Sequence, residues 1–227
     1  MMSPTTNHQP PTTPPAPRPV VVFDLDGTLV DTREDLAASG NAARRAVGLP
    51  DLPLADVVAC VGDGLHSLIE RLTPGGDAAM RAAAVAAFQR DYALTCTTAT
   101  RPYPGMIEAL DALHQVGWTL AVATNKPLGF SMRILDHLRL APRFAAVRGG
   151  DTVKKPDPGQ LLSIASELHA DPAAMWMVGD HRTDLRAAQA VGCRAVFCTW
   201  GFGQRDGLLA AAVADHATDL PRLIGRP

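Results

Sequence analysis

The sequence predicts an α/β protein, in which a doubly wound parallel sheet carries a helical insert after its first strand. Short runs that are apolar on both faces recur along the chain, and each ends at a polar turn. Helical patterns of ten or so residues separate these runs. Continuous apolar strands that alternate with helices are typical of a parallel sheet covered on both sides. Between the first two such units lies a long stretch with helical periodicity and no convincing strand, which is the insert.

The first strand is predicted at Val20–Phe23, a β-branched and aromatic run that stops at the polar turn Asp24-Leu-Asp-Gly-Thr28 before a helix begins near Asp31. The same order of strand, turn and helix recurs further along the chain. The other predicted strands are Trp118–Ala123, Met175–Val178, Ala195–Thr199 and a weaker one at Phe144–Val147.

The insert is predicted over residues 32–101, with residues 20–31 and 102–227 forming the α/β core. Hinges are expected at Asp31–Thr32 and at Arg101–Gly105, where two prolines break a helix and glycine permits a turn. The expected helices of the insert are Leu54–Cys60, Leu65–Leu72 and Ala78–Thr95, the last with Met80, Ala84, Ala87, Phe88 and Tyr92 on its inner face.

Composition excludes several classes of protein. The chain has 227 residues, of which 47% are hydrophobic, and 21 basic against 23 acidic side chains give a net charge of −2. That size supports a substantial core without disulfides or a structural metal. The balanced charge and 5% aromatic content disfavour nucleic acid as a partner. No uncharged apolar run approaches the ~18–20 residues needed to span a bilayer.

The first residues and the cysteines bear on location. Met1–Pro19 contains seven of the 19 prolines and lacks the apolar segment of a signal peptide, so it is interpreted as a disordered, solvated tail outside the fold. The four cysteines have no metal-binding spacing, which fits reduced, inert thiols in a cytoplasmic protein.

Polar side chains gather where the predicted strands end. In an open parallel sheet the carboxyl ends of the strands meet at one crevice, and ligands bind there. Carboxylates, a hydroxyl and an ammonium at such a crevice suit a hard divalent cation and a phosphate group, and Mg²⁺ prefers carboxylate oxygens. The residues concerned are Asp24, Asp26, Thr124, Lys126, Lys154, Lys155, Asp180 and Asp184.

Each of these residues also has a purely structural interpretation. An Asp or Thr between a strand and a helix is often only a helix cap, and Asp31, Thr183 and Asp184 all suit that purpose. Thr124 taken alone could be a strand-end hydroxyl. The motif Asp-x-Asp-Gly-Thr at residues 24–28 fixes four positions in a strand-turn-helix context, which chance and capping rarely produce together.

Four motifs resemble, in order, those of the haloacid dehalogenase-like hydrolases, and more closely the phosphoglycolate phosphatase-like branch. They are Phe23-Asp-Leu-Asp-Gly-Thr-Leu-Val-Asp31, Thr124-Asn-Lys-Pro127, Lys154-Lys-Pro-Asp157 and Val178-Gly-Asp-His-Arg-Thr-Asp184. The resemblance covers the chain from about Val20 to its end. It implies a Rossmann-like core, and it identifies the helical insert with the small cap that closes over the substrate in this family.

The resemblance implies specific roles for the first and fourth motifs. Asp24 would attack phosphorus and form an aspartyl-phosphate, while Asp26 would act as general acid and base. Mg²⁺ would be held by Asp24, the backbone carbonyl of Asp26, and Asp180. Asp184 would position the lysine or a metal-bound water.

The other motifs would bind the phosphate group and the rest of the substrate. Thr124 and Lys155 would hold the transferring oxygens, with Lys155 chosen over its neighbour because it directly precedes proline. The resemblance further implies phosphate contacts from Gly27, Thr28 and Asn125. The segment Val61–His66 resembles a glycine-flanked specificity loop, so Asp63 and His66 are expected to contact the substrate, with a plain helix-helix turn as the alternative.

The expected function is Mg²⁺-dependent hydrolysis of a small phosphorylated metabolite, foremost 2-phosphoglycolate, by a monomer or homodimer. A dehalogenase has no need of an acid/base at Asp26, so that activity is disfavoured. A phosphosugar phosphatase or mutase shares the motifs and stays open as an alternative, as does a non-catalytic interaction protein on the same fold. The sequence departs from the family pattern at His181 and at the turn Trp200-Gly-Phe-Gly203. These departures leave the expected chemistry intact and bear on the identity of the substrate.

Overall fold

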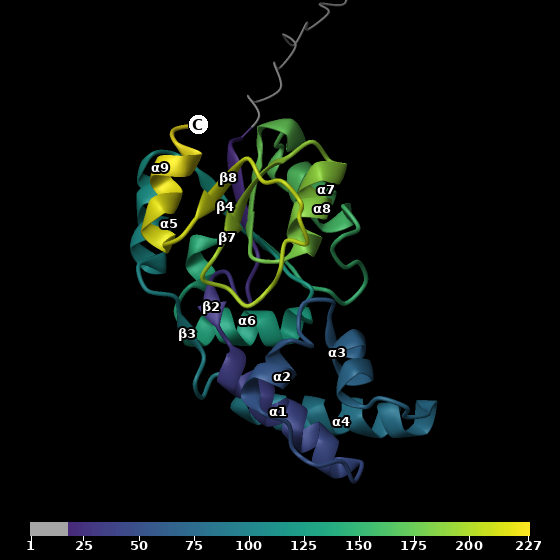
Figure 1. The fold of residues 1–227 in the computed structure, drawn as a ribbon. Helices are drawn as coiled ribbons and strands as arrows, with labels where there is room; N and C mark the ends of the chain where they lie inside the picture. Colours follow the sequence, from purple (N-terminus) through teal and green to yellow (C-terminus); the bar gives the residue numbers. More distant parts are fainter. Residues whose placement is uncertain (1–17) are drawn as a thin grey trace, which may run out of the picture.

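The computed structural model describes residues 18–227 and contains one six-stranded sheet in the order β5-β4-β1-β6-β7-β8 (Figure 1). Every neighbouring pair in this sheet is parallel. The strands are β1 (Val20–Phe23), β4 (Thr119–Ala123), β5 (Ala146–Arg148), β6 (Trp176–Gly179), β7 (Arg194–Cys198) and β8 (Ala212–Ala214). The predicted α/β class is therefore confirmed.

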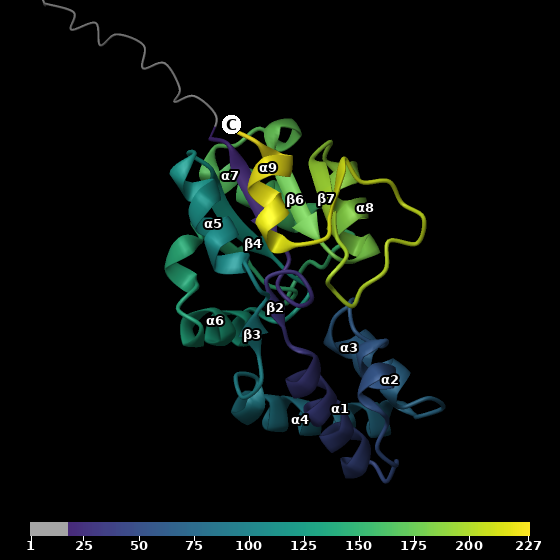
Figure 2. The ribbon, with the colours of Figure 1, turned by 60° about the vertical axis from the view of Figure 1, so that its left-hand side comes forward.

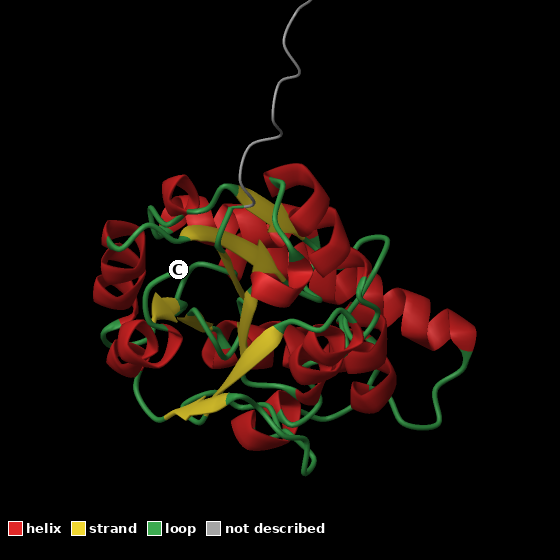
Figure 3. Ribbon diagram, turned by 90° about the horizontal axis from the view of Figure 1, so that it is seen from above, coloured by secondary structure: helices red, strands yellow, loops and turns green. Residues whose placement is uncertain are grey.

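Helices cover both faces of the sheet, as the view from above shows (Figure 3). Alternate residues of β1 enter two separate core clusters. Val21 and Phe23 pack with α5 (Met106–Gln115), α6 (Leu128–His137) and α9 (Leu220–Ile224). Val20 and Val22 instead pack with α7 (Gly159–Leu168) and α8 (Arg182–Ala190). This double burial explains why the strand reads as a continuous apolar run.

The insert forms four helices that lie beyond the carboxyl ends of the strands (Figures 1 and 2). Helix α1 packs against both α4 and α2, and α3 packs against α4. The helices predicted at Leu65–Leu72 and Ala78–Thr95 have the predicted bounds in the structure. The helix predicted at Leu54–Cys60 ends two residues earlier, at Val58. Met80 is only half-buried, unlike the other residues of the predicted inner face. The four helices are α1 (Arg33–Ala46), α2 (Leu54–Val58), α3 (Leu65–Leu72) and α4 (Ala78–Thr95).

The chain enters and leaves the insert through a short antiparallel ribbon. Strand β2 (Val30–Asp31) pairs with β3 (Arg101–Pro102), with Val30 opposite Pro102 and Asp31 opposite Arg101. The backbone N–H of Tyr103 donates to the carbonyl of Leu29 at 3.1 Å, which extends the pairing by one step. Both predicted hinges therefore lie at one place in the fold.

The remaining elements are three short 3-10 helices, Ala141–Arg143, Pro172–Ala174 and Ala217–Asp219. Of the predicted proline-rich tail, all but Arg18 and Pro19 lies outside the described residues. None of the described helices combines the length and the apolar character needed to cross a membrane. All four cysteines are free thiols; three are buried and Cys60 is half-buried.

Candidate active site

Three carboxylates meet at the carboxyl edge of the sheet. Asp24 follows β1, Asp180 follows β6, and Asp184 lies in the first turn of α8. All three side chains are buried, and one oxygen of each lies within 4.8 Å of the others. Because β1 and β6 are neighbours in the sheet, residues far apart in the sequence come together here.

The ammonium of Lys155 enters this cluster. Its Nζ lies 2.9 Å from Asp24 Oδ1 and 2.6 Å from Asp184 Oδ1, and it also donates to the carbonyl of Ala123. Burial by itself lowers the pKa of Lys155, but the carboxylates of Asp184 and Asp24 outweigh it, so the pKa is raised and the charge is retained. Lys154 lies outside the cluster, against Gly64 of the insert.

The cluster carries more negative than positive charge, with three carboxylates against one ammonium. Burial, followed by the charges of Asp24 and Asp184, raises the pKa of Asp180 to about 8. Burial also raises the pKa of Asp24 to about 6, although Lys155 acts in the opposite direction. The single ammonium of Lys155 does not balance three buried carboxylates, and oxygen ligands suit a hard divalent ion. The residues present therefore fit Mg²⁺.

Asp180 is held by three hydrogen bonds. Thr28 Oγ1 donates to its Oδ1 at 3.0 Å, and the backbone N–H groups of Phe202 and Gly203 donate to its Oδ2 at 3.0 Å and 2.8 Å. Gly27 has φ +83°, and a Cβ there would lie 2.2 Å from Asp180 Oδ2. The structure thus places Gly27 and Thr28 against Asp180, and neither lines the substrate cavity described below.

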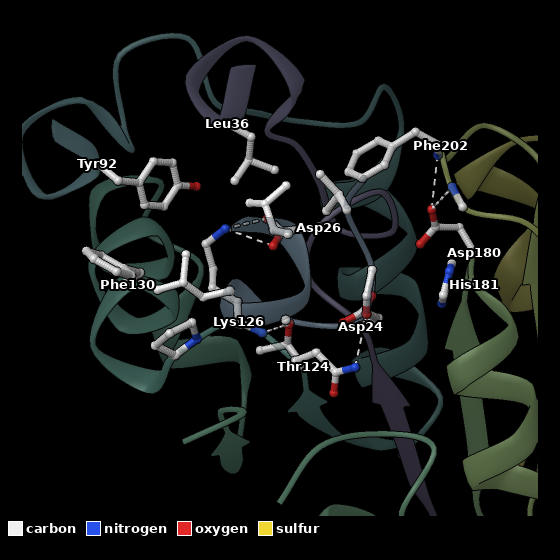
Figure 4. Close-up of a pocket in the computed structure, with 18 of the residues that line it drawn as sticks. Asp24, Asp26, Leu36, Tyr92, Thr124, Lys126, Phe130, Asp180, His181 and Phe202 are labelled. Carbon is white, nitrogen blue, oxygen red and sulfur yellow. Dashed lines mark hydrogen bonds and ion pairs between the residues drawn. The ribbon is translucent and has the colours of Figure 1, made fainter. Parts of the chain in front are cut away.

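The side chain of Asp26 points away from the cluster. Lys126 Nζ donates to both of its carboxylate oxygens, at 2.9 Å and 2.8 Å, and Thr32 Oγ1 donates at 2.8 Å. Thr32 is the residue directly before α1, so Asp26 bonds to the start of the insert as well as to the loop after β4. Its carboxylate faces a different region from that of Asp24 (Figure 4).

A cavity between the sheet and the insert joins these groups. Asp24, Asp26 and Asp180 line it with Thr124 and Asn125 from the loop after β4 (Figure 4). The insert supplies mainly apolar walls, which are Leu36, Val61, Leu65, Leu68, Phe88 and Tyr92. Phe130 and Phe202 from the core complete the apolar part. Apolar walls around a small set of polar groups are typical of a site for a small molecule.

The loop at residues 61–64 docks the insert onto the core. Asn125 Nδ2 donates to the carbonyl of Gly62 at 3.0 Å and to that of Lys155 at 2.8 Å. A Cβ on Gly62 would lie 2.7 Å from His181 Nε2, so the imidazole packs closely against the loop backbone. Asn125 therefore links the insert to the loop that carries the buried lysine.

Asp63 and His66 occupy places that differ from the predicted substrate contacts. Asp63 Oδ2 accepts from Arg182 at 3.0 Å and also pairs with Arg71. These arginines hold the pKa of Asp63 below its usual range despite the opposing effect of burial. His66 is exposed. The structure brings neither side chain into the cavity.

Three residues that line the cavity have no specific catalytic or binding role in the sequence analysis, although Lys126 belongs to the predicted polar group at the strand ends and His181 is noted as bearing on the substrate. His181 caps α8, since its Nδ1 accepts from the backbone N–H of Thr183 and its own N–H donates to Asp184 Oδ2. Burial, and then the neighbouring Arg182, lowers the pKa of His181. Lys126 follows a predicted strand, and Tyr92 lies on a predicted inner face. The position of Lys126 at a strand end is the signal that places it in the predicted phosphate-binding group, whereas the position of Tyr92 on a helix face indicates only a core residue.

Comparison with known proteins agrees with this geometry. Residues 21–198 match the family model described as haloacid dehalogenase-like hydrolase. The phosphoglycolate phosphatase of Nitrosospira multiformis is 36% identical over 200 residues, which cover 85% of this chain and 87% of that protein. The phosphoglycolate phosphatase of Neisseria meningitidis serogroup A is 38% identical over 190 residues, covering 81% of each chain.

A solved structure from Haemophilus somnus, described as that of a predicted phosphoglycolate phosphatase, has a TM-score of 0.85 at 28% identity. It covers 92% of this chain and 98% of its own. The match therefore includes the insert as well as the sheet. Fold, carboxylate cluster and relatives agree: this chain belongs to the haloacid dehalogenase-like hydrolases, in their phosphoglycolate phosphatase-like branch.

Proposed function

We propose that the chain is a Mg²⁺-dependent phosphatase that hydrolyses a small phosphate monoester, foremost 2-phosphoglycolate to glycolate and phosphate. The observation that carries the proposal is the shared cavity, which Asp24, Asp26 and Thr124 all line. The proposed nucleophile, acid/base and phosphate-binding hydroxyl thus line one cavity, in which the Asp26 carboxylate is turned toward Lys126. The alternative of a non-catalytic interaction protein gives no reason for this convergence.

In the proposed reaction an oxygen of Asp24 attacks phosphorus, the bond from phosphorus to the ester oxygen breaks, and Asp26 gives its proton to the departing alkoxide. Asp26 then takes a proton from the water that cleaves the aspartyl-phosphate, which restores Asp24 and releases phosphate. Lys155 orients Asp24 through the 2.9 Å contact, and Lys155 and Thr124 would hold the phosphoryl oxygens. Asp184 keeps Lys155 in place.

Mg²⁺ would be held by Asp24, the backbone carbonyl of Asp26, and Asp180, where it would neutralise phosphate charge and favour in-line attack. The hydrogen bonds from Thr28 and from the turn at residues 202–203 orient Asp180 for this purpose. The protein thereby provides a preformed set of oxygen ligands.

We further propose that residues 32–101 form the cap and residues 20–31 and 102–227 the catalytic core. The apolar walls that the insert adds to the cavity support this division. The curated relatives carry the name phosphoglycolate phosphatase, which supports the choice of substrate. A phosphosugar phosphatase or mutase is the second candidate. The cytoplasmic location and the monomeric or homodimeric state stay predictions.

The test is a steady-state assay of phosphate release from 2-phosphoglycolate, a hexose 1-phosphate and p-nitrophenyl phosphate, with Mg²⁺ and with EDTA. We expect Mg²⁺-dependent hydrolysis, fastest for 2-phosphoglycolate, and none by Asp24→Asn. Acid quenching during turnover should trap a phosphoryl group on the wild-type protein only. Isomerisation of the hexose phosphate without phosphate release would favour the mutase, and no reaction with any ester would contradict the proposal.

A further inference from the structure

Lys126 has an unusual position for a charged side chain. It follows β4, its side chain is only 5% exposed, and it lines the catalytic cavity. Two of its three ammonium N–H groups are accounted for by the carboxylate oxygens of Asp26, at 2.9 Å and 2.8 Å. Within residues 18–227, no other acceptor bonds to this ammonium. One N–H donor of a buried lysine is therefore left for a ligand.

Tyr92 supplies a second donor to the same region. Its ring lies on α4 of the insert, with the centroid 4.7 Å from Lys126 Nζ. The hydroxyl is buried and has no hydrogen-bond partner among the described residues. Figure 4 shows the hydroxyl directed into the cavity from the side opposite Phe202, toward the space above the lysine. A buried hydroxyl without a partner is costly unless a ligand or water satisfies it.

Lys126 supplies the cationic donor, and Tyr92 a hydroxyl donor on the insert side, of a cavity that is otherwise poor in positive charge. Among the described residues that line it, Lys126 is the one lysine or arginine. His181 also lines the cavity, but burial and the neighbouring Arg182 lower the pKa of its imidazole, which favours the uncharged form. The Lys155 ammonium is already surrounded by Asp24, Asp184 and the carbonyl of Ala123.

We propose that Lys126 and Tyr92 form the subsite that binds the carboxylate of a phosphorylated hydroxy acid, and so determine specificity for the organic part of the substrate. The inference rests on the proposed function and extends it. The ammonium and the phenol would each donate one hydrogen bond to the carboxylate, while the phosphate lies at Asp24. One donor belongs to the core and the other to the insert, so the anion would bridge the two parts when the cavity is closed.

The experiment compares 2-phosphoglycolate with 2-hydroxyethyl phosphate, which has a neutral hydroxymethyl group in place of the carboxylate. The quantity measured is the ratio of kcat/KM for the two esters, because any general damage to the acid/base Asp26 cancels in that ratio. The variants are Lys126→Met, Lys126→Arg and Tyr92→Phe. Tyr103→Phe is the matched control, since its hydroxyl is also buried without a partner but lies outside the cavity.

We expect the wild type to prefer 2-phosphoglycolate, and Lys126→Met to reduce that preference by about tenfold or more, as for a lost hydrogen bond to a charged group. Lys126→Arg should restore much of it. Tyr92→Phe should reduce it by about threefold to tenfold, and Tyr103→Phe should leave it unchanged. Equal losses for both esters in Lys126→Met, or equal ratios in the two Tyr→Phe variants, would overturn the subsite.

A binding measurement separates this inference from the proposed function. In an Asp24→Asn background, calorimetry gives the dissociation constants of both esters with and without Lys126→Met. A preference for 2-phosphoglycolate that disappears with Lys126→Met supports the subsite even if the wild type hydrolyses neither compound, in which case only the proposed function fails. Hydrolysis of 2-phosphoglycolate with no such binding preference retains the function and rejects the subsite.

Discussion

Lys155 Nζ lies 2.6 Å from Asp184 Oδ1, and neither side chain is more than 1% exposed. A buried ion pair adds little stability relative to apolar residues of the same size, but removing one partner leaves an uncompensated buried charge. If Asp184 is removed, Lys155 keeps its contact with Asp24, which belongs to the same cluster of three buried carboxylates. Asp184 is therefore expected to contribute to folding in addition to the role proposed for it above.

Asp184→Ala should lower the free energy of unfolding by about 1.5–3 kcal/mol, because it removes one of the two carboxylate partners of a buried lysine and one bond of the α8 cap. Urea denaturation in EDTA measures this. Asp51→Ala is the control, since Arg45 and Asp51 pair at 2.6 Å with both side chains about half exposed, and it should cost less than about 1 kcal/mol. Similar losses in the two variants would contradict the argument.

The metal-free protein should lose stability as the pH rises. Asp180 has a folded pKa of about 8 against an ordinary value of 3.8, so between these limits the folded chain holds a proton that the unfolded chain has released. Its contribution is fully present below 3.8 and is lost as the pH rises through about 8. Asp24 acts in the same direction up to about 6.

Thermal melts in EDTA from about pH 5 to about pH 8 measure this slope. Asp180→Asn should make the decline shallower, and saturating Mg²⁺ should do the same in the wild type because it replaces the missing positive charge. Added Mg²⁺ should raise the melting temperature of the wild type by more than that of Asp180→Asn. A wild-type melting temperature that rises with pH over this window in EDTA would contradict the raised pKa values of Asp180 and Asp24.

Gly201→Ala should displace Asp180 and abolish Mg²⁺-dependent activity. A Cβ on Gly201 would lie 2.3 Å from both Cβ and Oδ2 of Asp180, so the carboxylate and the turn that donates hydrogen bonds to it must move apart. Gly129→Ala, in α6, meets nothing within 4 Å and should slightly stabilise the helix without changing turnover. The comparison is made by magnesium titration of the activity. Full activity of Gly201→Ala at ordinary Mg²⁺ concentrations would remove the case for Asp180 as a ligand.

Asp63→Ala should lower kcat/KM by a similar factor for all substrates, about twofold to tenfold. The reason is that Asp63 contacts Arg71 and Arg182 and so affects closure of the loop rather than recognition of the substrate. The side chains of Asp63, Arg71 and Arg182 are partly exposed, so each ion pair stabilises the docked loop by at most about 1 kcal/mol. His66→Ala is the control and should have no effect. A change in the preference between 2-phosphoglycolate and p-nitrophenyl phosphate would restore Asp63 as a specificity residue.

The sheet could be predicted because its strands are buried on both faces. Val20–Phe23 carries only large apolar residues, and its bounds match the structure. The edge strand Ala212–Ala214 and the two-residue strands of the ribbon were missed because they are short and their residues have little strand character. Phe144 was assigned to a strand, whereas its N–H closes a 3-10 turn onto Ala141 and the strand starts two residues later.

The residues of the site also divide into those that the strand pattern places and those that depend on how the insert docks. Asp24 and Asp180 follow apolar strands, so topology alone places them at one edge of the sheet. The arrangement of Asp63 depends on where an inserted helix pair docks, which no local pattern encodes. Lys126 and Tyr92 meet across the same docking surface, and each separately resembles an ordinary loop lysine or core tyrosine.

The ribbon of β2 and β3 has a consequence for protein engineering. Since Val30–Asp31 and Arg101–Pro102 pair with each other, both ends of the intervening segment leave the sheet side by side. A chimaera that joins a different helical segment at these two strands would leave the backbone that carries Asp24 and Thr124 uncut. Transplanting the segment with Thr32 retained, because its hydroxyl bonds to Asp26, is therefore a direct test of how far the insert determines the substrate.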